Sequence, residues 1–307
     1  MSRRLVIDTD TASDDAVALV MALRNPAVTV DAITVVAGNV PLDLAVQNAL
    51  YTRDLCGSAV PVYAGRDAPL MRALETAQFV HGNDGMGDIG LPLSGRTPNE
   101  GHAADVLIET VMGSPGEITL VTLGPLSNVA TALLREPQIA NAVGHCFIMG
   151  GAGAGPGNVS ALAEFNFWAD PEAARVVVRS GMPFTLVGWD MSVRHATFGP
   201  DDAARIRSLG PLGEFCIDIQ AVVDDYARTQ SHLIGFDLPD PIAMAVAIDP
   251  GIATVEAHHI DVMIGDGEGR GKDIIDWLDT RRRDNGSVAT HVVREAFVTL
   301  LTEAVAG

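Results

Sequence analysis

The chain has 307 residues, of which 48% are hydrophobic, 5% aromatic and 19% charged, so it can bury a large core and is not a coiled-coil, disordered or collagen-like protein. Lys and Arg number 20 against 39 Asp and Glu, and the resulting net charge of −19 repels the phosphates of nucleic acids and anionic lipid surfaces. We therefore expect neither a nucleic acid nor a membrane as a partner.

Short β-branched runs alternate along the chain with amphipathic stretches. The runs predicted to be strands are Leu5–Ile7, Val28–Ala37, Val60–Tyr63, Ile118–Thr122, Cys146–Met149 and Phe184–Val187. The predicted helices are Asp14–Leu23, Leu42–Cys56, Asn128–Arg135 and Pro171–Ser180, followed by a helical pattern over Asp201–Thr229 and a helix that starts at Pro241. This alternation predicts an α/β fold, with an open, mostly parallel central sheet and helices on both faces.

Two segments, 81–101 and 150–160, are rich in Gly, Pro and Asn and are predicted to be long surface loops. The chain has no internal repeat and no low-complexity linker, so we expect a single domain over residues 1–307. The cysteines form no CxxC pair, and no apolar run has the length of a signal-peptide core or of a transmembrane helix. These features predict a cytoplasmic protein with reduced thiols.

The densest chemical signal is DTDTASDD at residues 8–15, which places four carboxylates at the end of the first predicted strand. Two like charges about 4 Å apart repel by roughly 4 kcal/mol at an effective dielectric constant near 20, so a cation is expected nearby. Lys272 is the only lysine and lies far away in the sequence, which favours a bound divalent cation with oxygen ligands. The alternatives are that Asp14 only caps the following helix, or that the acids form a solvated loop.

Further polar groups follow the later predicted strands, at Gly38-Asn39, LGPLSN (123–128) and Gly188-Trp-Asp190. Open α/β sheets bind ligands at the carboxyl ends of their strands, so these groups should converge. Asn158, Glu164 and Asn166 lie between two strands, and a spacing of two in an extended chain would point Glu164 and Asn166 the same way. Amides beside carboxylates suit a ligand with many hydroxyl groups, such as a sugar, although a loop Asn can simply bond its own backbone.

These motifs resemble those of the inosine-uridine-preferring nucleoside hydrolases, in the same order and over nearly the whole chain. The matching segments are DTDTASDD, GN at 38–39, HGNDGMG at 81–87, LGPLSN, the N(x5)ExN of 158–166 and DPIAMAVAIDP at 240–250. The resemblance implies a calcium-dependent enzyme that cleaves the N-glycosidic bond of ribonucleosides to ribose and free base. It also implies the open α/β fold of that family.

The same resemblance assigns roles to individual residues. It places Ca²⁺ on Asp10, Asp15, Asp240 and the backbone carbonyl of Leu123, where many relatives have Thr; only the carbonyl oxygen is used, so this difference is tolerable. The residues that would hold the ribose hydroxyls are Asp14, Asn158, Glu164 and Asn166. Asn39 would lie close to the reacting centre, and Asp10 would take the proton of the water that attacks the anomeric carbon.

The sequence departs from the family where the leaving base is activated. Many members have a His immediately before the last metal-binding Asp, and that His is the proposed acid; here the position is Pro239. The candidates for contact with the base, or for replacing the acid, are His81, Phe79, Phe165, Trp189, Tyr226 and His232. The sequence does not choose among them, since a lone His or aromatic side chain can also be structural.

The sequence thus predicts an N-ribosyl hydrolase that acts on ribonucleosides with Ca²⁺, as a homo-oligomer, a dimer or a tetramer. Two other functions stay open. A non-catalytic ribose- or nucleoside-binding protein would have lost its acid with Pro239. A magnesium-dependent phosphohydrolase of the haloacid dehalogenase type also opens with Asp8-x-Asp10 after an apolar strand, but it needs Thr or Val where this chain has Ala12. The preferred base is not specified.

Overall fold

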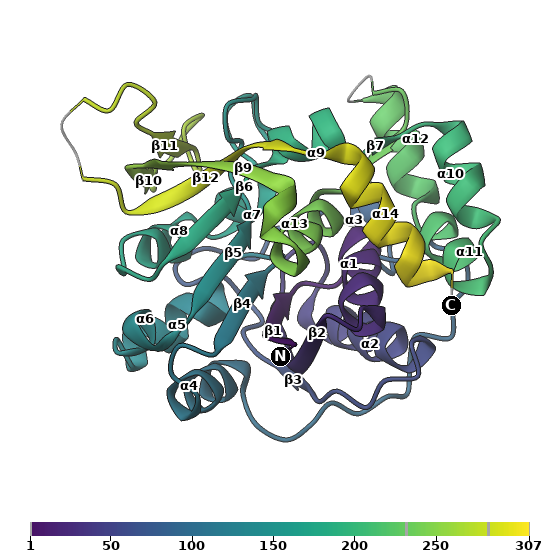
Figure 1. The fold of residues 1–307 in the computed structure, drawn as a ribbon, viewed down its shortest axis with the longest axis horizontal. Helices are drawn as coiled ribbons and strands as arrows, with labels where there is room; N and C mark the ends of the chain where they lie inside the picture. The colour runs from purple at the N-terminus through teal and green to yellow at the C-terminus, as the bar shows by residue number, and fades with distance from the viewer. Residues whose placement is uncertain (1, 231–232, 281–282, 307) are drawn as a thin grey trace.

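The computed structural model describes residues 2–230, 233–280 and 283–306, and within them an eight-stranded sheet runs through the molecule (Figure 1). The spatial order is β3 (Val62–Ala64), β2 (Val28–Val35), β1 (Arg3–Thr9), β4 (Ile118–Thr122), β5 (His145–Met149), β6 (Phe184–Val187), β12 (Gly286–Val292) and β9 (Ala253–His258). Neighbouring strands are parallel except for the antiparallel pair β12 and β9. The mostly parallel sheet predicted from the sequence is confirmed.

Helices cover both faces of this sheet. One core contains the helices α1 (Ser13–Arg24), α2 (Leu42–Leu55), α13 (Pro239–Ile248) and α14 (Arg294–Val305). The other contains α4 (Ala103–Gly113), α5 (Ser127–Arg135), α6 (Ile139–Ala142) and α8 (Pro171–Val178). In β1, Leu5 and Ile7 belong to the first core and Val6 to the second, because successive side chains of a strand point to opposite faces. The run Leu5–Ile7, which is apolar at every position, therefore suits a sheet that is buried on both faces.

The remaining elements lie around the two layers. They are α3 (Gln78–His81), α7 (Phe165–Ala169), α9 (Trp189–His195), β7 (Thr197–Phe198), α10 (Pro200–Arg207), α11 (Pro211–Asp218), α12 (Ala221–Thr229), β8 (Phe236–Asp237), the 3-10 helix η1 (Pro250–Ile252), β10 (Ile260–Val262) and β11 (Asp273–Ile275). The strands β7 and β8 form one antiparallel pair, and β10 and β11 form another. Within the described ranges, every helix is too short or too polar to cross a lipid bilayer.

Three local predictions were wrong. The helical pattern over Asp201–Thr229 is broken into α10, α11 and α12, because Gly210 has a φ of 131° and Pro211 begins a new helix. The helix expected from Pro241 starts earlier, at Pro239. The segment that holds Glu164 and Asn166 is not extended, since Glu164 caps the amino end of α7.

The carboxyl ends of the parallel strands meet at one edge of the sheet, as the parallel register requires. Asp10 follows β1, Asn39 comes after β2, Leu123 follows β4 and Gly150 follows β5. These segments converge at the position where open α/β sheets bind their ligands. The fold therefore gathers residues from distant parts of the chain along one edge.

Candidate functional site

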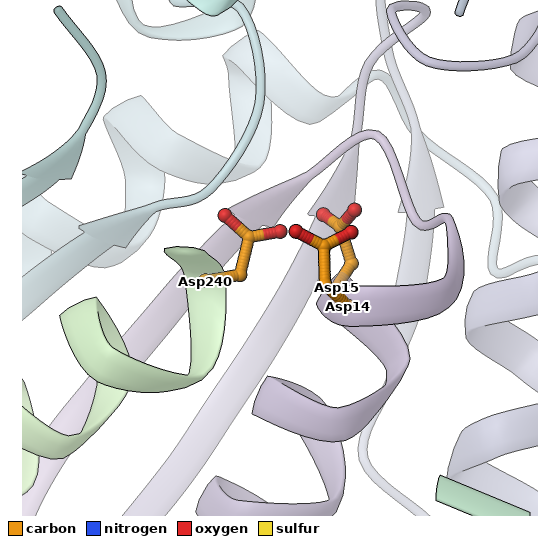
Figure 2. Close-up of side chains that lie close together, drawn as sticks. All are labelled: Asp14, Asp15 and Asp240. Carbon is orange, nitrogen blue, oxygen red and sulfur yellow. The ribbon is translucent and has the colours of Figure 1, made fainter. Parts of the chain in front are cut away.

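Three carboxylates from two helix starts lie side by side at this edge (Figure 2). Asp14 and Asp15 occupy the first turn of α1, and Asp240 occupies the first turn of α13. All three are buried, and one oxygen from each lies within 4.8 Å of the others. The helices α1 and α13 share a core, so packing of apolar side chains brings the acids together. The carboxylate of Asp15 also accepts hydrogen bonds from Thr9 Oγ1 at 2.5 Å and from the Ala12 N–H at 3.0 Å.

Asp10 completes the cluster from the turn between β1 and α1. It is fully buried, and its Oδ2 accepts a hydrogen bond from the Asn39 N–H at 2.6 Å. Two glycines leave room for it: a Cβ on Gly38 would lie 2.1 Å from Asp10 Oδ2, and a Cβ on Gly124 would lie 2.5 Å from Asp10 Oδ1. The backbones that follow β2 and β4 can approach this carboxylate only because they carry no side chain there.

The electrostatics of the cluster fit a divalent cation. Burial, followed by the charge of Asp15, raises the pKa of Asp10, Asp14 and Asp240 well above the ordinary value. Among the described residues, Oδ1 of each of these three acids is buried without a hydrogen-bond partner. Unpartnered carboxylate oxygens that converge from several elements are the donor set that hard cations such as Ca²⁺ and Mg²⁺ prefer. The same atoms would be costly to bury in an empty site.

Leu123, whose carbonyl was predicted as a further metal ligand, lies just past the end of β4 and is buried. Its oxygen accepts a hydrogen bond from Asn166 Nδ2 at 2.6 Å. The amide of Asn166 thereby links α7 to the strand end beside Asp10. A predicted ribose ligand and a predicted metal ligand are in direct contact.

A pocket opens over this edge and collects the residues predicted to bind the sugar. Its lining includes Asp14, Asn39, Leu123, Asn158, Glu164, Asn166 and Asp240. Asn158 Oδ1 accepts from the Phe165 N–H at 2.9 Å, which fixes the side chain against α7. Asp10 and Asp15 do not line the pocket. Asp10 lies directly behind Asn39, one hydrogen bond away from the pocket wall.

Glu164 is held by the backbone around it. Its Oε1 accepts from the Asn166 N–H at 2.7 Å, and its Oε2 accepts from the Gly151 N–H at 2.7 Å and the Phe167 N–H at 3.3 Å. Burial raises the pKa of Glu164 to about 7, and the three N–H donors oppose this rise. The carboxyl group caps α7 and fixes the turn after β5, so it also holds Asn166 in position.

Aromatic side chains also line the pocket. Phe79, His81, Phe165, Trp189 and Tyr226 all line it, and the rings of Phe79 and Tyr226 meet edge to face at 5.7 Å. His81 Nδ1 lies 2.9 Å from Ser13 Oγ, and burial lowers the pKa of this imidazole to about 4. His81 is therefore neutral at neutral pH. His232, the remaining predicted contact, lies outside the described residues.

One titratable group of the pocket was missed in the sequence. Asp237 lines it, together with Pro239, which begins α13 two residues later. Leu238 lies between them and is buried. No periodic or motif signal in the sequence marks Asp237, because it is a single carboxylate in a short segment.

Comparison with known proteins extends the likeness to the whole chain. The sequence profile of the inosine-uridine preferring nucleoside hydrolases matches residues 5–299. The pyrimidine-specific ribonucleoside hydrolase RihB of Escherichia coli O1:K1 / APEC is 37% identical over 309 aligned residues, covering 99% of this chain and 97% of that protein. A plant nucleoside hydrolase, PpNRh1, superposes with a TM-score of 0.94 at 33% identity over 100% of both chains. The purine-preferring ribonucleoside hydrolase from Gardnerella vaginalis gives a TM-score of 0.92 at 32% identity, over 99% of this chain and 98% of that one.

Proposed function

The chain belongs to the inosine-uridine preferring nucleoside hydrolase family, and we propose that it hydrolyses the N-glycosidic bond of ribonucleosides with a bound Ca²⁺ and Asp10 as the base. The observation that carries this proposal is the set of three buried, unpartnered carboxylate oxygens beside a pocket lined with amide and carboxylate groups. An ion site alone would fit many enzymes. The polar wall beside it fits a polyhydroxylated sugar.

In this proposal Asp10, Asp15, Asp240 and the Leu123 carbonyl hold the ion. When bound, Ca²⁺ would neutralise the acidic cluster and make a coordinated water more acidic. Asp14, Asn158, Glu164 and Asn166 bind the ribose hydroxyl groups, which both donate and accept hydrogen bonds. Asn39 fixes Asp10 through its backbone N–H and itself lines the pocket.

The chemistry follows from this arrangement. Asp10 accepts a proton from water as the water oxygen attacks the anomeric carbon and the bond to the base breaks. The sugar becomes positively charged in the transition state, as in other glycoside hydrolysis, and the carboxylates beside the pocket stabilise that charge. A site with a surplus of acids is thus suited to the transition state more than to the neutral substrate.

Release of free base from inosine, uridine, cytidine and adenosine by the purified chain with Ca²⁺ tests the proposal directly. Hydrolysis of p-nitrophenyl riboside should accompany it, since this leaving group needs little protonation. Saturable nucleoside binding without release of base or of p-nitrophenol would identify a binding protein instead. Release of phosphate from a sugar phosphate, with no cleavage of ribosides, would point to the phosphohydrolase.

Because polar side chains are proposed to bind the ribose hydroxyl groups, we expect the enzyme to select against deoxyribosides. Removal of the 2′-hydroxyl leaves buried polar groups unpaired, which costs roughly 1.5–3 kcal/mol, so kcat/KM should fall about 10- to 150-fold from inosine to 2′-deoxyinosine. Steady-state kinetics with the two nucleosides measure this ratio. Equal values of kcat/KM would contradict a pocket that reads the ribose.

The names of the relatives point to different preferred bases, because one is called pyrimidine-specific and another purine-preferring at similar sequence identity. In this proposal the aromatic residues of the pocket contact the base, with Phe165, Tyr226 and His81 as candidates. Three further properties stay predictions: a cytoplasmic location, a single domain, and a homo-oligomeric state as a dimer or a tetramer. Light scattering of the purified protein would measure the number of subunits.

A further inference from the structure

Asp237 occupies a position that the predicted roles leave unused. It ends β8, where it pairs with Thr197 of β7, and it lines the pocket together with Pro239. Leu238, between them, is buried in the core. Asp237 and Pro239 both border the same cavity, on either side of the buried Leu238. A carboxyl group thus stands next to Pro239, the position at which the family resemblance would place a histidine.

The two carboxylate oxygens of Asp237 differ in their hydrogen bonds. Oδ2 accepts from Trp189 Nε1 at 2.8 Å and from Ser192 Oγ at 2.5 Å, both on α9. Within the described ranges, Oδ1 receives no hydrogen bond from another residue. One oxygen is therefore anchored to the protein, and the other is available to a ligand in the pocket.

We propose that Asp237 is the acid that protonates the departing base, through Oδ1, in place of the missing histidine. This inference rests on the proposed nucleoside hydrolysis. As the bond from the anomeric carbon to the base nitrogen breaks, its electron pair passes to the base, and the proton of Asp237 moves to a ring nitrogen or carbonyl oxygen of that base. Asp10 takes the proton of the attacking water. After release of the products Asp10 gives this proton to solvent and Asp237 takes one from solvent, so that the sum is nucleoside plus water to ribose plus base.

The surroundings of Asp237 suit both states of this cycle. Burial is the main cause that raises the pKa of its carboxyl group, which favours the protonated form before the reaction. After proton transfer, the donors of Trp189 and Ser192 stabilise the carboxylate. Two other positions are poorer donors: Pro239 has no side-chain proton, and His81 is neutral because burial lowers its pKa to about 4.

The test compares Asp237→Asn with the wild type on inosine, uridine and p-nitrophenyl riboside, at saturating Ca²⁺. A general acid contributes about 10²–10⁴-fold, so kcat on inosine and uridine should fall by about that factor while kcat on p-nitrophenyl riboside changes little. The matched control is Asp224→Asn, which removes a carboxylate from α12 that pairs with Arg228 at 2.8 Å and does not line this pocket. That variant should keep all three activities.

A uniform loss on all three substrates, no loss, or a change confined to KM would overturn the assignment of Asp237 as the acid. If the wild type cleaves none of the three substrates, it is the proposed function that fails. Ser192→Ala provides a second test if Asp237→Asn does not fold. It removes one donor to Oδ2 and should produce a smaller loss of the same selective kind, on inosine and uridine but not on p-nitrophenyl riboside.

Discussion

Replacing Asp10 with Asn should lower kcat for ribonucleosides by about 10²–10⁴-fold, the usual contribution of a general base. The variant keeps an oxygen that can accept the Asn39 N–H, so the turn after β1 can stay in place. It loses the negative charge that the proton transfer and the ion both require. Free-base release from inosine under single-turnover conditions measures the loss. Wild-type rates in the variant would remove both roles proposed for Asp10.

Stability separates lost chemistry from lost folding in this variant. Burial, together with the charge of Asp15, raises the pKa of Asp10 in the metal-free protein, so the ionised form costs stability at neutral pH. Metal-free Asp10→Asn should therefore melt at a higher temperature than metal-free wild type. Asp8→Asn is the matched control, because Asp8 is equally buried near the end of β1 but accepts hydrogen bonds from Thr34 and Asn128. It should retain most of its turnover.

Removing Ca²⁺ with a chelator should abolish turnover and lower the melting temperature, and added Ca²⁺ should restore both. An ion that binds only the folded chain stabilises it by about 2.7 kcal/mol at a hundredfold excess over Kd. Calorimetry or thermal melts with chelator, Ca²⁺ and Mg²⁺ measure this effect. Asp15→Asn should lose most of the Ca²⁺-dependent shift, whereas Glu109→Gln, at an exposed position on α4, should keep it. The same shift in both variants would indicate non-specific binding to an acidic surface.

The effect of Ca²⁺ should depend on pH in a defined direction. The pKa values of Asp10, Asp14 and Asp240 are raised in the metal-free fold, so their contribution to stability is present below their ordinary pKa, about 3.8, and is lost as the pH rises through the raised values. The ion binds the deprotonated acids, so its stabilisation grows over the same range. The Ca²⁺-induced shift in melting temperature should be larger at neutral pH than near pH 5. A shift of equal size at both would contradict ion binding at these carboxylates.

The sheet could be predicted because its central strands are buried on both faces. Leu5–Ile7 and Ile118–Thr122 are short apolar runs between turn signals, and both are strands in the structure. The C-terminal strands β9 and β12 were not predicted. No position of β9 is buried, since it lies at the edge of the sheet, and β12 buries only three of its seven residues, so neither has the continuous apolar run of a central strand.

The site was predictable only in part, because its residues meet through long-range packing. Asp10, Asp14 and Asp15 form a visible cluster in the sequence, but only the family resemblance connected Asp240 to them. Asp237 was missed because one carboxylate in a short segment carries no periodic signal. Its role depends on the direction in which β8 points its side chain and on which carboxylate oxygen accepts the hydrogen bonds from α9. Neither can be read from residue spacing.

The distance in sequence between the two halves of the acidic cluster has a consequence for assembly. Asp15 is near the start of the chain and Asp240 is far toward its end, and they meet only when α13 packs against α1. During synthesis the first acids leave the ribosome long before their partner. Contacts between such distant segments carry a large loop-closure cost and tend to form late. We therefore expect a bound ion to slow unfolding much more than it speeds folding, so that it prolongs the lifetime of the finished protein.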